Sequence, residues 1–272
     1  MISLARTLRR LANRASLLYA LLVFGFLYLP ILIVALFSFD ASRVSGLPID
    51  GPTLHWYREA FANRNILEGL RTSVGVALTS ASLSTLIGLF AAQAIVRHAF
   101  RGRTAFIGTL VGTLTVPYIV MGISLLMLFR YLGVALSPIT IVIAHTMFGI
   151  AYATLIICSR LIALPESLIE AALDLGANEV RTFWEVVLPL TSPALFSAFL
   201  LCFTQSFDEF IVAWFVAGFS RTLPILIWNS LRHGLNPSLN AIATLLFTAT
   251  MSISLLALVW LFRPTGRNTG RS

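Results

Sequence analysis

Long runs of uncharged, apolar residues alternate with short charged segments along this chain. Six of these runs are long enough to cross a bilayer, since ~20 apolar residues in a helix span ~30 Å of hydrocarbon. The pattern therefore predicts an all-α membrane protein with six transmembrane helices, built as a single domain over 1–272. The expected spans are about 16–38, 71–96, 105–129, 139–159, 192–214 and 239–262.

The segments between these spans predict the orientation of the chain. Positively charged residues favour the cytoplasmic side of a membrane. With the N-terminus inside, twelve of the nineteen basic residues fall on the cytoplasmic side, and the rule places both termini in the cytoplasm. These twelve are Arg6, Arg9, Arg10, Arg14, Arg97, Arg101, Arg103, Arg160, Arg181, Arg263, Arg267 and Arg271. We expect an extracytoplasmic loop at 39–70, a cytoplasmic loop at 160–191, and an extracytoplasmic segment at 217–238 that contains a surface or re-entrant helix.

The composition agrees with a membrane protein and excludes several functions. Hydrophobic residues make up 58% of the chain and charged residues 11%, against ~25% charged residues in an average soluble domain. All nineteen basic residues are arginine. The absence of lysine excludes a Walker A loop and a Schiff-base mechanism. The arginines form no continuous basic stripe, so no nucleic-acid partner is expected.

The cytoplasmic loop at 160–191 has the pattern of two short helices. An apolar stripe at helical spacing marks the first helix, and Gly176 stands where a left-handed turn would end it. Ser167 and Glu170 have the spacing of a capping box, and Asn178 can cap the second helix. Pro189 is expected to mark the return into the membrane. The stripe of the first helix consists of Leu168, Ala171, Ala172 and Leu175.

Three acidic residues, Glu166, Glu170 and Asp174, form a ladder beside this stripe. One interpretation is a solvated polar face, which is the usual role of a charge run. The other is a docking surface for a soluble partner, because the loop has little of its own against which to bury an apolar stripe.

The same loop resembles a known sequence motif. Glu170-Ala171-Ala172, Gly176 and Val186-x-Leu188-Pro189 match the EAA loop of binding-protein-dependent ABC importer permeases, with valine in place of isoleucine at 186. The resemblance implies a type I ABC importer permease (MetI-like) fold in a bacterial cytoplasmic membrane, without enzymatic activity. It also implies that Glu166, Glu170, Ala171, Ala172, Asp174, Gly176, Val186, Leu188 and Pro189 couple the chain to an ATPase.

Further stretches are similar to the second permease of spermidine/putrescine importers. They are 38–43, 100–103, 124–129, 208–218 and 223–246. The resemblance implies three partners: an ATP-binding cassette ATPase dimer that carries ATP and magnesium, a second, distinct homologous permease, and an extracytoplasmic solute-binding protein. This chain is expected to bind no cofactor. Importers of ferric iron, thiamine and opine-like or amino-acid-derived compounds share parts of these stretches, so the substrate stays open.

Asp208 and Glu209 are the only acidic residues placed within a span, if the fifth helix continues to Trp214. Acidic side chains at that depth usually face a polar cavity or a partner. They either line the substrate pathway, where they would attract a cation, or they reach the outer headgroup region or pair with Arg221 or Arg232. Tyr118 and Trp214 are candidate aromatic contacts for a cation, although such residues more often serve packing.

The remaining sequence features suggest no metal site and no catalytic site. Pro117, before Tyr118, predicts a kink in the third span. The four histidines are isolated and suggest no metal site, and His145 is expected to bond a neighbouring helix. An ion-coupled secondary carrier is the alternative transporter, but no internal repeat supports it. An intramembrane hydrolase lacks a nucleophile and base.

Overall fold

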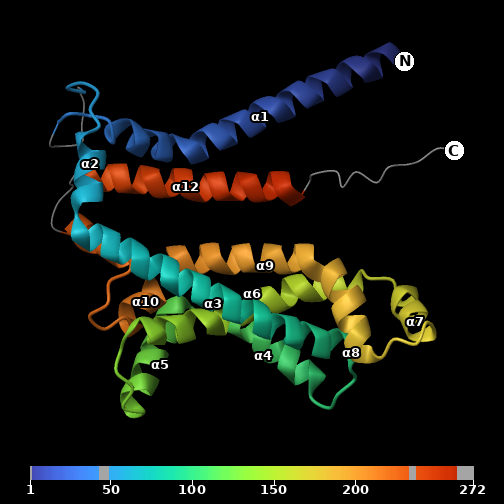
Figure 1. The fold of residues 1–272 in the computed structure, drawn as a ribbon. Coiled ribbons are helices and arrows are strands. Elements are labelled where there is room, and N and C mark those ends of the chain that lie inside the picture. The colour runs from blue at the N-terminus through green and yellow to red at the C-terminus, as the bar shows by residue number, and fades with distance from the viewer. Residues whose placement is uncertain (1, 43–48, 233–236, 262–272) are drawn as a thin grey trace. The chain divides into compact units, whose positions relative to one another are not determined.

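The computed structural model describes residues 2–42, 49–232 and 237–261, and its regular elements are helices (Figure 1). The chain divides into two compact units, which we describe separately. One comprises residues 1–63 and 229–272, with α1 (Ile2–Phe37), α2 (His55–Ala62) and α12 (Pro237–Leu261). The other, 64–228, holds α3 (Arg64–Arg97), α4 (Arg103–Thr115), α5 (Tyr118–Tyr131), α6 (Pro138–Ile162), α7 (Glu166–Asp174), α8 (Glu179–Thr182), α9 (Leu188–Asp208), α10 (Ile211–Val216) and most of α11 (Leu223–Arg232).

The described residues include four helices that are long and apolar enough to cross a membrane. They are Arg14–Phe37, Arg64–Arg97, Pro138–Ile162 and Glu179–Asp208, and the bent pair α4–α5 makes a fifth if it is one span. The prediction of an all-helical membrane protein is confirmed. The sixth predicted span, 239–262, coincides with α12 as far as Leu261, while Phe262 and the arginines at 263, 267 and 271 lie outside the described residues, as does Arg43.

The third predicted span, 105–129, is broken rather than merely kinked. α4 ends at Thr115, α5 begins at Tyr118, and the two helix axes differ by 107°. Pro117 sits at the N-cap of α5, where its missing N–H removes no hydrogen bond. The predicted bend is confirmed, and the two halves are separate helices.

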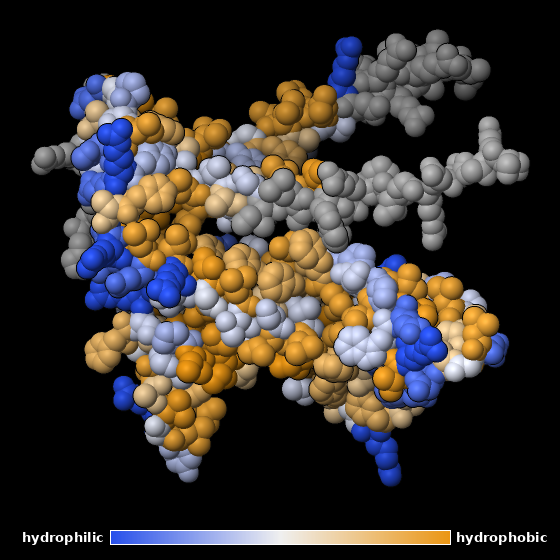
Figure 2. All heavy atoms as spheres, in the orientation of Figure 1, coloured by the Kyte–Doolittle hydropathy of each residue, from blue (hydrophilic) through white to orange (hydrophobic). Residues whose placement is uncertain are grey.

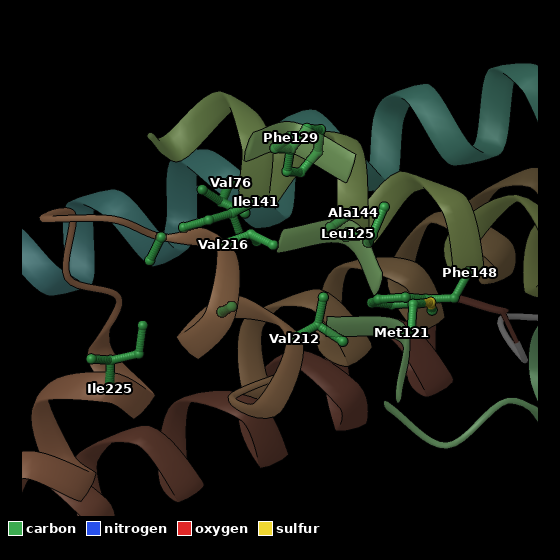
Figure 3. Packing of buried hydrophobic residues seen from close by; sticks show 12 residues of the cluster. Val76, Met121, Leu125, Phe129, Ile141, Ala144, Phe148, Val212, Val216 and Ile225 are labelled. Atoms are coloured by element: carbon green, nitrogen blue, oxygen red, sulfur yellow. The ribbon is translucent and has the colours of Figure 1, made fainter. Parts of the chain in front are cut away.

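In the larger unit, α3, α6 and α9 pack against one another, and α10 packs against α5 and α6 (Figure 1). Figure 3 shows one hydrophobic cluster, in which Val76 of α3, Leu125 of α5, Ile141 of α6 and Val212 of α10 converge. Close approach of the long helices depends on small residues. A Cβ placed on Gly149 of α6 would lie 2.9 Å from the Cβ of Ser84 on α3, and closer still to its hydroxyl.

The surface of this unit has the polarity of a membrane-spanning body. In Figure 2, hydrophobic side chains cover much of the α3–α9 bundle, while hydrophilic residues gather at its two ends. Such a band is expected where helices face hydrocarbon rather than water. Cys158 and Cys202 lie within this bundle as free thiols, the former half-buried and the latter buried.

In the smaller unit, α12 packs against α1 and α2, and a fixed turn follows α1. The Asp40 carboxylate accepts hydrogen bonds from the Ser42 hydroxyl and, at 3.0 Å, from the Asp50 N–H. These bonds, the Ser42 hydroxyl first, hold the pKa of Asp40 below its usual value despite the opposing effect of burial. The indole N–H of Trp56 donates to the Asp40 carbonyl at 2.7 Å and ties α2 to the turn.

The packing of α3 on α6 predicts a large effect for a small substitution. Gly149→Ala should lower the free energy of unfolding by ~1–3 kcal/mol, because the added methyl group overlaps the buried Ser84 side chain. The measurement is thermal unfolding in detergent. Gly112→Ala is the matched control, since open space surrounds Gly112 and alanine favours a helix by up to ~1 kcal/mol. Equal melting temperatures for the two variants would contradict the close contact.

Candidate functional site

A helix break lies at the acidic pair in the larger unit. α9 ends at Asp208, Glu209 has extended backbone angles, and α10 begins at Ile211. The helix predicted over 192–214 is therefore not continuous. The Glu209 carboxylate explains the break: it accepts the Val212 N–H at 2.8 Å and the Ala213 N–H at 3.0 Å, at the start of α10. Free N–H groups at a helix N-terminus are stabilised by a negative charge.

His145 of α6 also contacts the Glu209 carboxylate. Its Nε2 atom lies 3.2 Å from Oε2 of Glu209, and the two side chains are only 1% and 2% exposed. Its Nδ1 atom lies 2.7 Å from the Ser206 hydroxyl on α9, which in turn accepts a hydrogen bond from Ser80 on α3 at 2.9 Å. The prediction that His145 bonds a neighbouring helix is confirmed.

The two ring nitrogens of His145 make different kinds of contact. The Ser80 hydroxyl donates to the Ser206 hydroxyl, which is hydrogen-bonded to Nδ1 of His145. Nε2 lies in close electrostatic contact with Oε2 of Glu209 but forms no hydrogen bond with the described residues. Three helices, α3, α6 and α9, are joined through the two serines and His145. Sequence patterns did not indicate Ser80 or Ser206, because single serines in apolar helices carry no motif.

Asp208 differs from Glu209 in its exposure and in its contacts. Its side chain is exposed, and it forms no hydrogen bond or ion pair with the part of the chain that the structure describes. Glu209, in contrast, pairs with His145 and backbone N–H groups rather than with the arginines considered above. Of the two acidic residues, Glu209 is occupied in holding the helix break, and Asp208 is free to meet a ligand.

Aromatic and amide groups surround the same break. The Tyr118 hydroxyl at the start of α5 accepts a hydrogen bond from the Gln205 amide at 2.8 Å. Gln205 lies three residues before Asp208, so the two are neighbours on the surface of α9. Trp214 is 40% exposed and packs on Phe210, with ring centroids 5.6 Å apart. The structure thus brings Tyr118 into the surroundings of the acidic pair, and places Trp214 one turn into α10.

This arrangement can bind a cation without a metal ion or cofactor. It offers one unpaired carboxylate, an amide and the faces of aromatic rings, which attract ammonium groups. Within the described residues, no cluster of three histidine, cysteine or acidic side chains could hold a metal ion.

The loop at 160–191 has the predicted first helix, α7. Its end is a Schellman motif: Gly176 has φ +86°, the Gly176 N–H donates to the Leu173 carbonyl at 2.9 Å, and the Ala177 N–H donates to the Ala172 carbonyl at 3.1 Å. Asn178 caps α8 by accepting the Arg181 N–H at 2.8 Å. Both helix-end predictions are confirmed.

One other prediction for this loop is wrong. Pro165, not Ser167, occupies the N-cap of α7, and no side chain caps that end, so there is no capping box with Glu170. The second helix continues past Pro189. α8 passes through a π-helical turn at Phe183–Val187 directly into α9, so that Val186, Leu188 and Pro189 lie along one continuous helical segment.

The acidic ladder and the apolar stripe of α7 both face outward. Glu166, Glu170 and Asp174 are exposed, as is Ala171, while Ala172 is half-buried. Leu168 is 44% exposed and Leu175 is 89% exposed. A leucine this exposed beside three carboxylates is an apolar surface that no described residue covers.

Comparison with known proteins gives one family for most of the chain. The profile of the family described as binding-protein-dependent transport system inner membrane component matches residues 84–265. The spermidine/putrescine transport system permease protein PotC of Haemophilus influenzae is 37% identical over 240 residues, which cover 88% of this chain and 93% of that protein. The putrescine transport system permease protein PotI of Escherichia coli K12 is 36% identical over 245 residues, 87% of each chain.

A solved structure agrees with the fold. It is a bacterial ABC transporter involved in the import of the acidic polysaccharide alginate, and one of its chains aligns with a TM-score of 0.65 at 20% identity. The alignment covers 94% of this chain and 95% of that chain. At this identity the likeness establishes the fold alone.

The helix break predicts opposite results for two adjacent substitutions. Glu209→Gln places an amide NH₂ group against the donors of His145 or α10, and a buried unmatched donor costs ~1–3 kcal/mol. The melting temperature in detergent should fall by several degrees. Asp208→Asn is the control, and it should leave the melting temperature unchanged, because the Asp208 side chain is exposed and unpaired among the described residues. Similar shifts for both variants would refute the capping role of Glu209.

Proposed function

Because the chain belongs to the family of binding-protein-dependent transport system inner membrane components, we propose that it forms half of the translocation pathway of an ATP-driven importer of polyamines such as spermidine or putrescine. As a permease, the chain is a multi-pass inner-membrane transport subunit and not an enzyme. It uses ATP and magnesium bound by a partner ATPase dimer. A second permease completes the pathway, and an extracytoplasmic solute-binding protein delivers the substrate.

The unpaired Asp208 carboxylate beside Tyr118 and Gln205 is the observation that carries the choice of substrate. A polyamine presents ammonium groups separated by methylene segments. Asp208 would bind one ammonium group, while the faces of Tyr118 and Trp214 contact a second ammonium group or the methylene segment between them. The relatives named for spermidine and putrescine support this choice. Glu209 contributes by holding the break that presents Asp208.

We further propose the topology that the arginines favour, with six spans and both termini in the cytoplasm. The four candidate spans, the bent pair α4–α5 counted as one span, and α12 would make up the six. In this orientation, the segments 39–70 and 217–238 face the solute-binding protein, and the loop with α7 faces the ATPase. Residues 43–48 and 233–236 of these outer segments lie outside the described residues.

The exposed face of α7 supports the coupling role. The ATPase would cover Leu168 and Leu175 with an apolar cleft, and basic residues on its rim would meet Glu170 and Asp174. Gly176, in its left-handed conformation, fixes the angle at which α7 leaves the following helix. Since α8 continues through the π-helical turn into α9, a displacement of the loop would be carried along this helical segment toward the break at Asp208 and Glu209.

The substrate assignment is tested by uptake into vesicles that contain the whole importer. Asp208→Asn should raise the KM for labelled spermidine about tenfold, because ~1.4 kcal/mol of charge attraction is lost. Glu185→Gln, which removes an equal charge at an exposed position of the cytoplasmic loop outside α7, is the control for a general loss of negative charge and should leave the KM unchanged. Unaltered spermidine kinetics in Asp208→Asn would refute the proposed site. Uptake of an unrelated solute with no uptake of polyamines would refute the substrate class.

The coupling role is tested by detergent co-purification with the ATPase and the second permease. Leu175→Glu should release the ATPase while the permease pair survives, because it puts a charge into the proposed apolar contact without disturbing the fold of this exposed position. Glu185→Gln changes an exposed charge of the same loop outside α7, and it should keep the ATPase at wild-type stoichiometry. Full retention of the ATPase by Leu175→Glu would mean that α7 is not the docking element.

A further inference from the structure

A cavity of about 510 Å³ lies between the end of α3 and the loop that follows α6. Its walls come from the last two turns of α3, from one side of α7, and from α8 with the π-helical turn. None of its lining residues belongs to the substrate site described above. The polar and charged side chains that line it are Gln93, Arg97, His98, Glu166, Glu179 and Thr182.

Three of these side chains have buried polar atoms without a partner. The Nε and Nη2 atoms of Arg97, the Oε1 atom of Gln93 and the Oγ1 atom of Thr182 form no hydrogen bond with the described residues. Thr182 is only 3% exposed. Leaving buried polar groups unpaired costs free energy, and a guanidinium group is the most demanding of them. Their common position around one cavity indicates that a ligand supplies the missing partners.

The charges around the cavity select the ligand. The Arg97 guanidinium is a donor suited to phosphate oxygens. Glu166 and Glu179 line the same cavity with two carboxylates, which would repel a purely anionic ligand. A zwitterion that carries a phosphate and a primary ammonium group a few bonds apart matches both the guanidinium group and the two carboxylates. The Thr182 hydroxyl is a further donor for the phosphate, and the Gln93 carbonyl is an acceptor for the ammonium group.

The remaining walls are apolar and include Phe90, Ile169, Leu173 and Trp184. Trp184 is 61% exposed beside the cavity, and tryptophan is enriched at the level of lipid headgroups. In the proposed topology the end of α3 reaches the cytoplasmic surface of the bilayer. A soluble phosphate compound would leave these apolar walls in contact with water, whereas the acyl chains of a lipid would cover them.

We propose that this cavity binds a zwitterionic aminophospholipid of the inner leaflet, with its phosphate on Arg97 and its ammonium group on Glu166 and Glu179. This rests on the topology given under the proposed function. The lipid and the ATPase contact different sides of α7. Residues advance by ~100° along a helix, so Glu166, Ile169 and Leu173, which line the cavity, lie roughly opposite Leu168, Ala171 and Leu175. The lipid thus supports α7 from the membrane side while the outer stripe stays open for docking.

The test is the retention of lipid by the intact importer, purified from vesicles of equal parts phosphatidylethanolamine, phosphatidylcholine and phosphatidylglycerol. Mass spectrometry should find phosphatidylethanolamine enriched about fivefold over phosphatidylcholine, whose trimethylated ammonium cannot donate hydrogen bonds. Arg97→Gln should lose this bound lipid, and Arg101→Gln, an exposed arginine nearby, should keep it. Glu166→Gln with Glu179→Gln, both at exposed positions, should reduce the enrichment to the level of phosphatidylcholine.

Several results would overturn the proposal. Equal lipid retention by Arg97→Gln and Arg101→Gln would do so, as would a preference for phosphatidylglycerol. Displacement of the lipid by millimolar inorganic phosphate would identify a site for a free anion instead. Bound lipid that is found only after the ATPase has been stripped from the importer would assign the cavity to the protein partner. The readout does not involve transport, so a failure of the polyamine assignment would leave this test intact.

Discussion

A buried carboxylate governs the centre of this molecule. Glu209 is inside an apolar bundle, where an unpaired charge would be prohibitively expensive. It is tolerated because both of its oxygens are occupied, by two N–H groups at the start of α10 and by the imidazole of His145. These N–H groups are free to bind it only if α9 stops before them. The charge and the helix break therefore require each other, and neither would be stable alone.

The break has consequences beyond its own position. It turns the chain so that α10 packs on α5 and α6, which closes the cluster around Val212 and Ile141. It also ends α9 with Asp208 on the exposed side, next to the Tyr118–Gln205 hydrogen bond. Two adjacent acidic residues thus divide their roles. Glu209 is held in a network that involves α3, α6, α9 and α10, and it maintains the helix break. Asp208 keeps its charge available, which a transport site for a cation requires.

The sequence predicted features whose causes are local. The glycine at 176, the asparagine at 178 and the proline at 117 act on the residues beside them, and each marks a helix end in the structure. The break after Asp208 has a cause far away in the chain. Its partner His145 belongs to another helix, and the serine that extends the network, Ser80, is 126 residues from Ser206. An apolar run that continues through Phe210–Phe219 reads as one helix, because only the tertiary partner makes the interruption favourable. Pro189, expected to mark the return into the membrane, follows the π-helical turn Phe183–Val187 in the second position of α9.

The formation of α7 also depends on tertiary contacts. A helix of nine residues is too short to be stable in isolation, so its packing on both sides decides whether it forms. The side toward the bundle rests on Ile169, which packs with the cluster of α3, α6 and α9, and on the walls of a cavity with unpaired polar atoms. The opposite side presents Leu175 to the surroundings. A ligand in the cavity and a protein on the outer stripe would each stabilise α7, so that binding of one favours binding of the other without direct contact. Lipid composition would then act on the affinity for the ATPase through the order of a single helix.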